Sequence, residues 1–162
     1  MCIIQVYMLI MENSKEEVGD MYEKVEQLLD AETKGKDYTV VMADFNAVVG
    51  EGKEDGYVGH YDLGCRNDLG LMLVDICKRR QIYIANTWFT QTRYTWLKLG
   101  DIAGYQIYYI LTNHRYWNCV CNAKAYPGVN VDSDHNTVVA KLNLMKFIVC
   151  SLDPRLTVAK KY

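Results

Sequence analysis

Two short polar motifs carry the side chains in this chain that are best suited to acid–base chemistry. Asp44-Phe45-Asn46 follows one apolar run, and Ser133-Asp134-His135 precedes another. In an extended segment, Asp44 and Asn46 lie on one face and Phe45 on the other. A carboxylate beside a carboxamide suits water activation, because the carboxylate accepts the water's proton while the amide holds the water by a hydrogen bond.

The second motif offers a hydrogen-bond donor and a further carboxylate. His135 can donate to a phosphate oxygen, and Asp134 can bind a divalent cation or help to position the site. Each motif alone also has an ordinary explanation, since Asp and Asn are common in turns after strands. An Asp-His pair in a loop is usually just solvated. The two motifs together, each beside a predicted strand, indicate a site more strongly than either one.

The elements around the first motif predict a crossover unit. Residues 3–10 have the composition of a buried strand, and Ser14 with Glu17 forms a capping-box pattern that starts a helix with one apolar stripe. Residues 38–42 are β-branched and apolar, which indicates a second buried strand. This order places Asp44 at the carboxyl end of a strand, where ligand sites of α/β proteins gather.

The second half of the chain predicts one more helix and several short strands. Residues 50–66 form a long glycine-rich loop, and Asn67-Asp68 has the pattern of a helix cap. That helix ends near Lys78-Arg79-Arg80, where cations favour the helix dipole. Turn signals separate predicted strands at residues 82–85, 94–97, 106–111, 119–126 and 137–142.

Composition narrows the class of protein. Half of the 162 residues are hydrophobic and 23% are charged, which predicts a packed core. The apolar runs are far too short for a membrane span, and the N-terminus lacks the basic segment of a signal peptide. Six scattered cysteines, with Cys119 and Cys121 the only close pair, indicate reduced thiols and an intracellular protein, nuclear or cytoplasmic. The net charge of -2 gives no support for strong non-specific DNA binding.

The motifs, taken in order, resemble the endonuclease/exonuclease/phosphatase superfamily. Residues 40–47 resemble its Gly-Asp-Phe-Asn signature. The other matching segments follow in the family's order, as Arg66-Asn67-Asp68-Leu69-Gly70, Ile84-Ala85-Asn86-Thr87-Trp88-Phe89, Tyr94-Thr95-Trp96, Gln106-Ile107-Tyr108-Tyr109-Ile110-Leu111 and Ser133-Asp134-His135. The order and spacing of these motifs resemble those of endonuclease domains from LINE-type retrotransposons, and are especially similar to those of the craniofacial development protein 2-like group. The resemblance covers about residues 3–146.

The resemblance implies an α/β (α+β) fold, in which a two-sheet β-sandwich of the DNase I-like type is flanked by helices and lacks its N-terminal strands. It implies a partial endonuclease/exonuclease/phosphatase domain over residues 1–146 and a divergent tail over residues 147–162. A sheet without those strands would leave an edge or face exposed, so we expect self-association through it. DNA is the implied partner, and no membrane is implied.

The resemblance also implies roles for individual residues. Asp44 resembles the residue that activates the attacking water, and Asn46 the one that orients this water or the phosphate. His135 resembles the histidine that binds the scissile phosphate, and Asp134 the late acidic residue of the metal and water network. Tyr7 resembles the active-site tyrosine at the end of an early strand, although a core tyrosine in that strand is nearly as good an interpretation. The implied cofactor is Mg²⁺, with Mn²⁺ as an alternative.

Two departures from the family pattern lower the expected activity. The family has an Asn and a metal-binding Glu before the tyrosine, whereas residues 1–6 contain no Asp, Glu or Asn, so metal binding should be impaired. The family's Gln-Ile-Asp-Tyr-Ile is Gln106-Ile107-Tyr108-Tyr109-Ile110 here. Tyr108 thus replaces the Asp that pairs with the histidine, and it supplies no negative charge at neutral pH. We assign Thr95-Trp96 mainly to core packing.

The sequence therefore predicts a partial metal-dependent phosphodiesterase of the DNA endonuclease type, derived from a retrotransposon and weak or inactive as this chain. Two alternatives stay open. One is a non-catalytic scaffold or interaction module. The other is a phosphatase of the same superfamily that acts on small phosphate esters.

Overall fold

The structure is a computed structural model that describes residues 1–8, 14–33, 38–54, 56–91, 94–97, 104–126 and 133–146. The predicted tail, residues 147–162, lies outside the described residues. The elements in chain order are β1 (Cys2–Tyr7), α1 (Lys15–Thr33), β2 (Thr39–Asp44), α2 (Asp68–Arg80), β3 (Ile82–Ile84), the 3-10 helix η1 (Ala85–Trp88), β4 (Tyr108–Asn113), the 3-10 helix η2 (His114–Cys119), β5 (Val120–Tyr126) and β6 (Thr137–Leu142). No helix among these residues is both long and apolar enough to cross a membrane.

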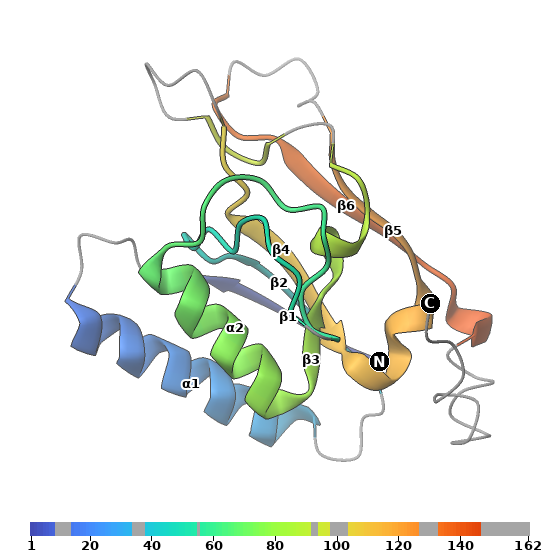
Figure 1. The fold of residues 1–162 in the computed structure, drawn as a ribbon. Helices are drawn as coiled ribbons and strands as arrows, with labels where there is room; N and C mark the ends of the chain where they lie inside the picture. Colours follow the sequence, from blue (N-terminus) through green and yellow to red (C-terminus); the bar gives the residue numbers. More distant parts are fainter. Residues whose placement is uncertain are drawn as a thin grey trace.

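The elements form three layers. One sheet has the strand order β1-β2-β4-β3, and the other pairs β5 with β6. Helices α1 and α2 lie on one face of the four-stranded sheet, and β5 and β6 lie on the other side (Figure 1). Each face therefore has its own apolar core. The core on the helix side includes Val41 and Leu73, and the core between the sheets includes Val40 and Ala123.

The predicted crossover unit is confirmed. Ser14 Oγ accepts a hydrogen bond from the backbone N–H of Glu17, and the Glu17 carboxylate accepts one from the backbone N–H of Ser14. This capping box satisfies donors that a helix N-terminus otherwise leaves unpaired. The buried positions of α1 follow the expected stripe, as Val18, Tyr22, Val25 and Leu29. β1 and β2 are parallel, in a register that pairs Tyr7 with Asp44.

Helix α2 begins at the predicted cap. The side chain of Asn67 accepts from the backbone N–H of Gly70 at 2.8 Å, and also from that of Val48 at 3.0 Å, so one side chain fixes both the helix and the segment after β2. Gln81 ends the helix with a left-handed φ of 54°. The basic last turn also contacts α1, because Arg80 forms ion pairs with Glu26 and Asp30 of that helix.

Most of the predicted strands are confirmed with shifted ends, and one is wrong. Strand β6 has the predicted bounds, whereas residues 94–97 form no strand and carry only single β-bridges at Trp96. Those bridges join Trp96 to two different segments, one at Tyr105 and one at His135. Trp96 therefore lies between two segments and pairs with each of them at a single position. Residues 94–97 have the β-forming composition of a strand, but the pairing is too short to make one.

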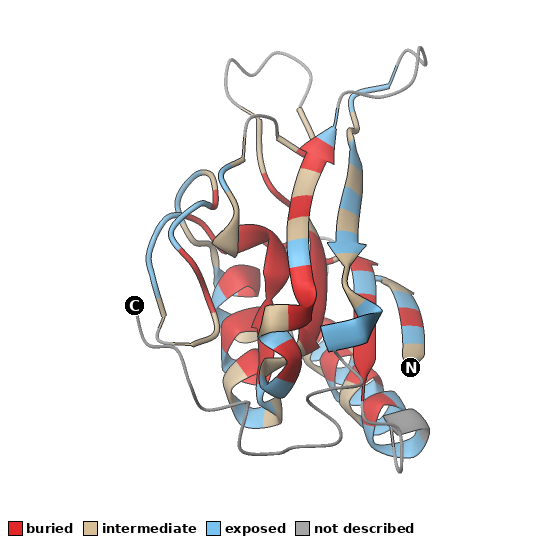
Figure 2. Ribbon diagram, turned by 90° about the vertical axis from the view of Figure 1, so that its right-hand side faces the viewer, coloured by how far each residue is buried: buried red, intermediate tan, exposed pale blue. Residues whose placement is uncertain are grey.

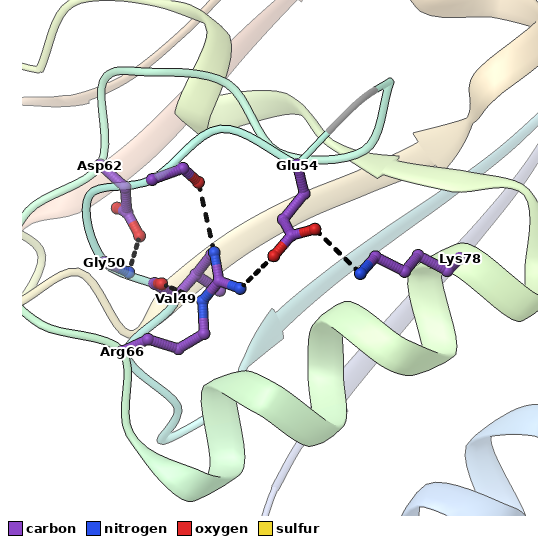
Figure 3. Close-up of polar contacts among 7 residues, drawn as sticks. Val49, Gly50, Glu54, Asp62, Arg66 and Lys78 are labelled. Carbon is purple, nitrogen blue, oxygen red and sulfur yellow. Dashed lines mark hydrogen bonds and ion pairs between the residues drawn. The ribbon is translucent and has the colours of Figure 1, made fainter.

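The long loop between β2 and α2 is tied down by a charged network. Arg66 Nε donates to the Val49 carbonyl at 2.8 Å, and its Nη1 pairs with Glu54 at 2.8 Å (Figure 3). Glu54 in turn pairs with Lys78 of α2 at 2.9 Å. Asp62, which is 2% exposed, accepts from the Gly50 N–H at 2.7 Å. The loop is therefore an ordered part of the scaffold.

The face of the four-stranded sheet that bears β5 and β6 is left open at β1. Ile3 is 56% exposed and Met42 is 37% exposed. Most positions of β1, the strand at the N-terminus in Figure 2, are exposed or intermediate, whereas four of the six residues of β4 are buried. The exposed sheet face agrees with what the sequence predicted, and self-association through it stays a prediction.

Candidate functional site

Three side chains lie in one row across the four-stranded sheet. Tyr7, Asp44 and Tyr108 stand at paired positions of β1, β2 and β4. Paired residues of neighbouring strands point to the same face of a sheet. Asp44 is therefore flanked by two tyrosines. Tyr7 is 71% exposed, which rules out the interpretation of Tyr7 as a core residue.

The segment around Trp96 brings the second motif to this row. The backbone N–H of Leu97 donates to the Asp134 carbonyl at 2.9 Å, and that of Asn136 donates to the Thr95 carbonyl at 2.8 Å. On the other side, the buried hydroxyl of Thr95 accepts from the backbone N–H of Ile107 at 2.8 Å. Thr95 and Trp96 thus hold the segment that leads into β4 and the Asp134-His135 segment next to each other.

His135 contacts the sheet through Tyr108. The Tyr108 hydroxyl lies 2.6 Å from His135 Nδ1, and the planes of the two rings differ by 12°. On the other side of the ring, His135 Nε2 lies 3.5 Å from Asp134 Oδ1. Trp96 Nε1 donates to Asp134 Oδ2 at 3.0 Å. Asp44, Tyr108, His135 and Asp134 are therefore linked into one constellation.

Asn46 belongs to the site by a different geometry from the one predicted. The strand ends at Asp44, and Asn46 has a φ of 49°, so the two side chains are not successive members of one extended face. Asn tolerates this left-handed conformation better than most residues. The backbone N–H of Asn46 donates to Asp44 Oδ1 at 3.0 Å, and its amide Nδ2 donates to the Met8 carbonyl at 2.8 Å. Phe45, as expected, points into the core on the helix side.

The electrostatics of the row favour a neutral tyrosine beside an acid that holds its proton more tightly than usual. Burial raises the pKa of Asp44, and hydrogen bonds from the Asn46 N–H and the Tyr108 hydroxyl, with the proximity of His135, partly offset this rise. Burial, followed by the neighbouring charges of Asp44 and Tyr7, raises the pKa of Tyr108 to about 12. Tyr108 therefore keeps its O–H at neutral pH.

The side chains at the site do not fit a divalent cation. Mg²⁺ prefers an octahedral shell with carboxylate oxygens. Within the described residues, no three His, Cys, Asp or Glu side chains gather closely enough to hold a metal ion. One oxygen of Asp44 also accepts a hydrogen bond from the Asn46 N–H, and one oxygen of Asp134 accepts a hydrogen bond from the Trp96 indole N–H. That metal binding is impaired stays a prediction.

Trp96 is the site residue that the sequence interpretation missed. Its ring centroid lies 6.4 Å from that of His135 and 6.0 Å from that of Tyr105, and its indole N–H fixes the Asp134 carboxylate. The prediction of core packing holds for Thr95, which is fully buried, but is wrong for the half-buried Trp96. An indole N–H needs an acceptor when its ring is partly buried, but no local pattern in the sequence connects Trp96 with Asp134, 38 residues away.

Comparison with known sequences finds similar proteins in two mammals, and both are called craniofacial development protein 2. The chain is 34% identical over 150 residues to craniofacial development protein 2 of Tragulus javanicus, and 33% identical over 150 residues to that of Bos taurus. The match covers 91% of this chain but only 26% and 25% of these relatives, so the chain spans about a quarter of their length. A scan against models of known protein families gives no match.

Comparison with solved structures identifies the fold. A 3'-5' exonuclease (NExo) from Neisseria meningitidis has a TM-score of 0.66 at 16% identity, over 87% of this chain and 60% of that one. An AP endonuclease from Archaeoglobus fulgidus has a TM-score of 0.59 at 13% identity, over 87% and 62%. The endonuclease domain of TRAS1, a telomere-specific non-LTR retrotransposon, has a TM-score of 0.53 at 13% identity, over 76% and 51%. The fold is therefore the DNase I-like fold of these nucleases.

Proposed function

We propose that this homologue of craniofacial development protein 2 is a phosphodiesterase-type domain of the DNA endonuclease kind, derived from a retrotransposon, which cleaves DNA only weakly as this chain. The observation that carries the proposal is the convergence of Asp44, Tyr108 and His135 from three distant parts of the chain. A carboxylate can accept the proton of an attacking water, and an imidazole can donate to a phosphate oxygen, so these groups suit phosphodiester hydrolysis.

Each residue has a role that its contacts support. Asp44, whose pKa burial raises, accepts the proton of the attacking water. The Asn46 amide is fixed by the Met8 carbonyl through Nδ2, so its Oδ1 is oriented to hold that water. His135 donates to a phosphate oxygen through Nε2. Asp134 accepts a hydrogen bond from Trp96, lies near the same nitrogen and sets the position of the ring. Tyr7 flanks Asp44 with an exposed hydroxyl.

The weakness of the proposed activity follows from the same contacts. Charge that develops on the phosphate needs compensation, which a cation or several fixed donors usually provide. The described part of the chain offers no metal cluster, and Tyr108 brings no negative charge to His135. The alternative function, a non-catalytic scaffold or interaction module, rests on these two observations.

The test is nicking of supercoiled plasmid by the purified chain with Mg²⁺ or Mn²⁺. We expect slow nicking that Asp44→Ala and His135→Gln both reduce to background. Asp75→Ala removes a carboxylate of the same kind from the exposed face of α2, so it serves as the matched control and should nick like the unmodified chain.

Nicking by the unmodified chain at the level of Asp44→Ala would reject catalysis and favour the scaffold alternative. A parallel assay for phosphate release from small phosphate esters separates the third possibility. Asp44-dependent release of phosphate, without nicking, would overturn the proposed DNA substrate and identify a phosphatase.

A further inference from the structure

Strand β1 is an edge of the four-stranded sheet, and its outer side is open. Within the described residues it pairs only with β2, and the two strands are parallel. The backbone N–H of Cys2 donates to the Tyr38 carbonyl, just before β2, at 2.7 Å. Along an extended strand, alternate residues direct their N–H and C=O groups to opposite sides. The backbone groups of Ile3, Gln5 and Tyr7 therefore point outward, away from β2.

This open edge lacks the features by which proteins prevent pairing with another chain. Those features include charged side chains, proline, bulges and a covering segment. Strand β1 contains no charged residue, proline or glycine, and its register with β2 is continuous. Its outward residues are not covered, since Ile3 is 56% exposed, Gln5 is exposed and Tyr7 is 71% exposed. The strand therefore combines open hydrogen-bonding groups with β-branched and aromatic side chains that favour a sheet.

The outward residues of β1 are complementary to those of a second copy of the same strand. If two copies run antiparallel about a two-fold axis at Gln5, Ile3 lies opposite Tyr7 of the partner subunit, and Gln5 lies opposite Gln5 of the partner subunit. Each pair can exchange two N–H···O=C hydrogen bonds, because these are the residues whose backbone groups point outward. A β-branched residue beside an aromatic ring is a favourable cross-strand pair. No like charges meet, since the strand carries no charged side chain.

Helix α1 adds an exposed apolar side chain beside this edge. Glu26 and Asp30 form ion pairs with Arg80, so they mark the flank of α1 that faces α2. At about 100° per residue, Leu28 lies on the opposite flank, and it is 41% exposed. Helix α2 leads directly into β3 at the opposite edge of the sheet, so the Leu28 flank lies toward β1 (Figure 1). A two-fold axis normal to the sheet keeps both helices on one face, so a second copy brings its own α1 next to this flank.

We propose that two copies of this chain form a dimer in which their β1 strands pair antiparallel, centred on Gln5, and join the two sheets into one. This inference stands apart from the proposed function. Ile3 of the partner subunit then lies beside Tyr7, at the end of the row that Tyr7 forms with Asp44 and Tyr108. A contact of one strand pair and two helix flanks is small beside the roughly 1,200–2,000 Å² of a stable interface. We therefore expect a dimer that dissociates at micromolar concentrations.

The experiment is sedimentation velocity of the full chain without metal, at concentrations from about 1 to 300 μM, which span the range expected of a small interface. We expect the sedimentation coefficient to rise from that of a monomer toward that of a dimer. Gln5→Pro removes an outward N–H that β2 does not use, and an edge strand tolerates proline at such a position. Gln5→Lys places two like charges opposite each other at the axis. Both variants should weaken the dimer by about tenfold or more, whereas Gln27→Lys, the same change on the exposed side of α1, should not.

A mixture of two variants tests the register. Gln5→Lys and Gln5→Glu should each dimerise poorly alone and form a dimer when mixed, because only the proposed register places Gln5 opposite its own copy. A chain that stays monomeric over the whole range overturns the proposal and leaves the edge to a strand of another protein. A dimer that Gln5→Pro leaves intact also overturns it, as does a mixture that stays monomeric. None of these outcomes depends on cleavage, so they are distinguishable from a failure of the nicking assay.

Discussion

Replacing Asp62 with Asn should stabilise the protein at neutral pH and hardly at all at pH 4. Asp62 is 2% exposed, and only one of its oxygens, Oδ2, takes hydrogen bonds, from the Gly50 N–H at 2.7 Å and the Tyr109 hydroxyl at 2.8 Å. The other oxygen, Oδ1, is buried without a hydrogen-bond partner. The ionised carboxylate is therefore poorly compensated. Asn keeps an oxygen that can accept from both groups and carries no charge.

The size of the effect follows from the pKa of Asp62. Burial raises that pKa from 3.8 to about 6, although the Tyr109 and Gly50 hydrogen bonds oppose the rise. The folded state thus binds the proton more tightly than the unfolded chain does. The stability that this contributes is fully present below pH 3.8 and is lost as the pH rises through about 6. The difference corresponds to about 3 kcal/mol at pH 7, at about 1.4 kcal/mol for each pKa unit.

The assay is urea unfolding, followed by tryptophan fluorescence at several pH values between 4 and 7.5. The quantity that tests the reasoning is the difference in unfolding free energy between Asp62→Asn and the unmodified chain. We expect it to grow by about 2.5 kcal/mol over this range, because the unfolded carboxyl is already partly ionised at pH 4, and to level off above about pH 7. Any constant offset reflects the new amide group and does not bear on the pKa. Asp75→Asn, at an exposed carboxylate of α2, is the control. Parallel pH curves for Asp62→Asn and the unmodified chain would refute the reasoning.

Four further predictions concern the scaffold, and urea unfolding at pH 7 measures each. Gly19→Ala should stabilise the protein by about 0.5–1 kcal/mol, because α1 has open space there and alanine favours a helix. Gly70→Ala should destabilise it, since a Cβ would lie 1.9 Å from the Val48 carbonyl oxygen; an equal gain at both sites would contradict this. Thr95→Val should cost about 1–3 kcal/mol for each buried N–H of Ile107 and Tyr108 that loses the hydroxyl acceptor. Tyr109→Phe should cost about 1–3 kcal/mol, since the buried Val49 N–H and Asp62 both lose a partner.

Local signals predicted the elements well. The capping box at Ser14, the cap at Asn67 and the alternation in β6 all involve residues within a few positions of one another, so the sequence contains the whole interaction. The two polar motifs were also correctly placed at strand ends, at Asp44 and before Thr137. Patterns of this range depend only on side chains and backbone groups that are close in sequence, which explains why they could be interpreted without a structure.

Non-local contacts could not be predicted in the same way. The left-handed conformation of Asn46 is fixed by the Met8 carbonyl, 38 residues away. The contact of Trp96 with Asp134 also spans 38 residues, and that of Asp62 with Tyr109 spans 47. No periodicity or cap connects such positions, since they meet only when the sheet has closed. For this reason the sequence predicted Trp96 in the core, and no pattern in the glycine-rich loop indicated that Asp62 is buried.

The neighbouring residues Tyr108 and Tyr109 show how sheet register divides scaffold from site. Side chains alternate along a strand, so a tyrosine pair sends one ring to each face of β4. Tyr109 is 1% exposed on the helix side, where it holds the loop through Asp62 and the Val49 N–H. Tyr108 faces Asp44 and His135 on the other side. A slip of one residue would exchange these roles and remove both networks at once. The contacts that stabilise the loop therefore also specify the register that places Tyr108 between Asp44 and His135.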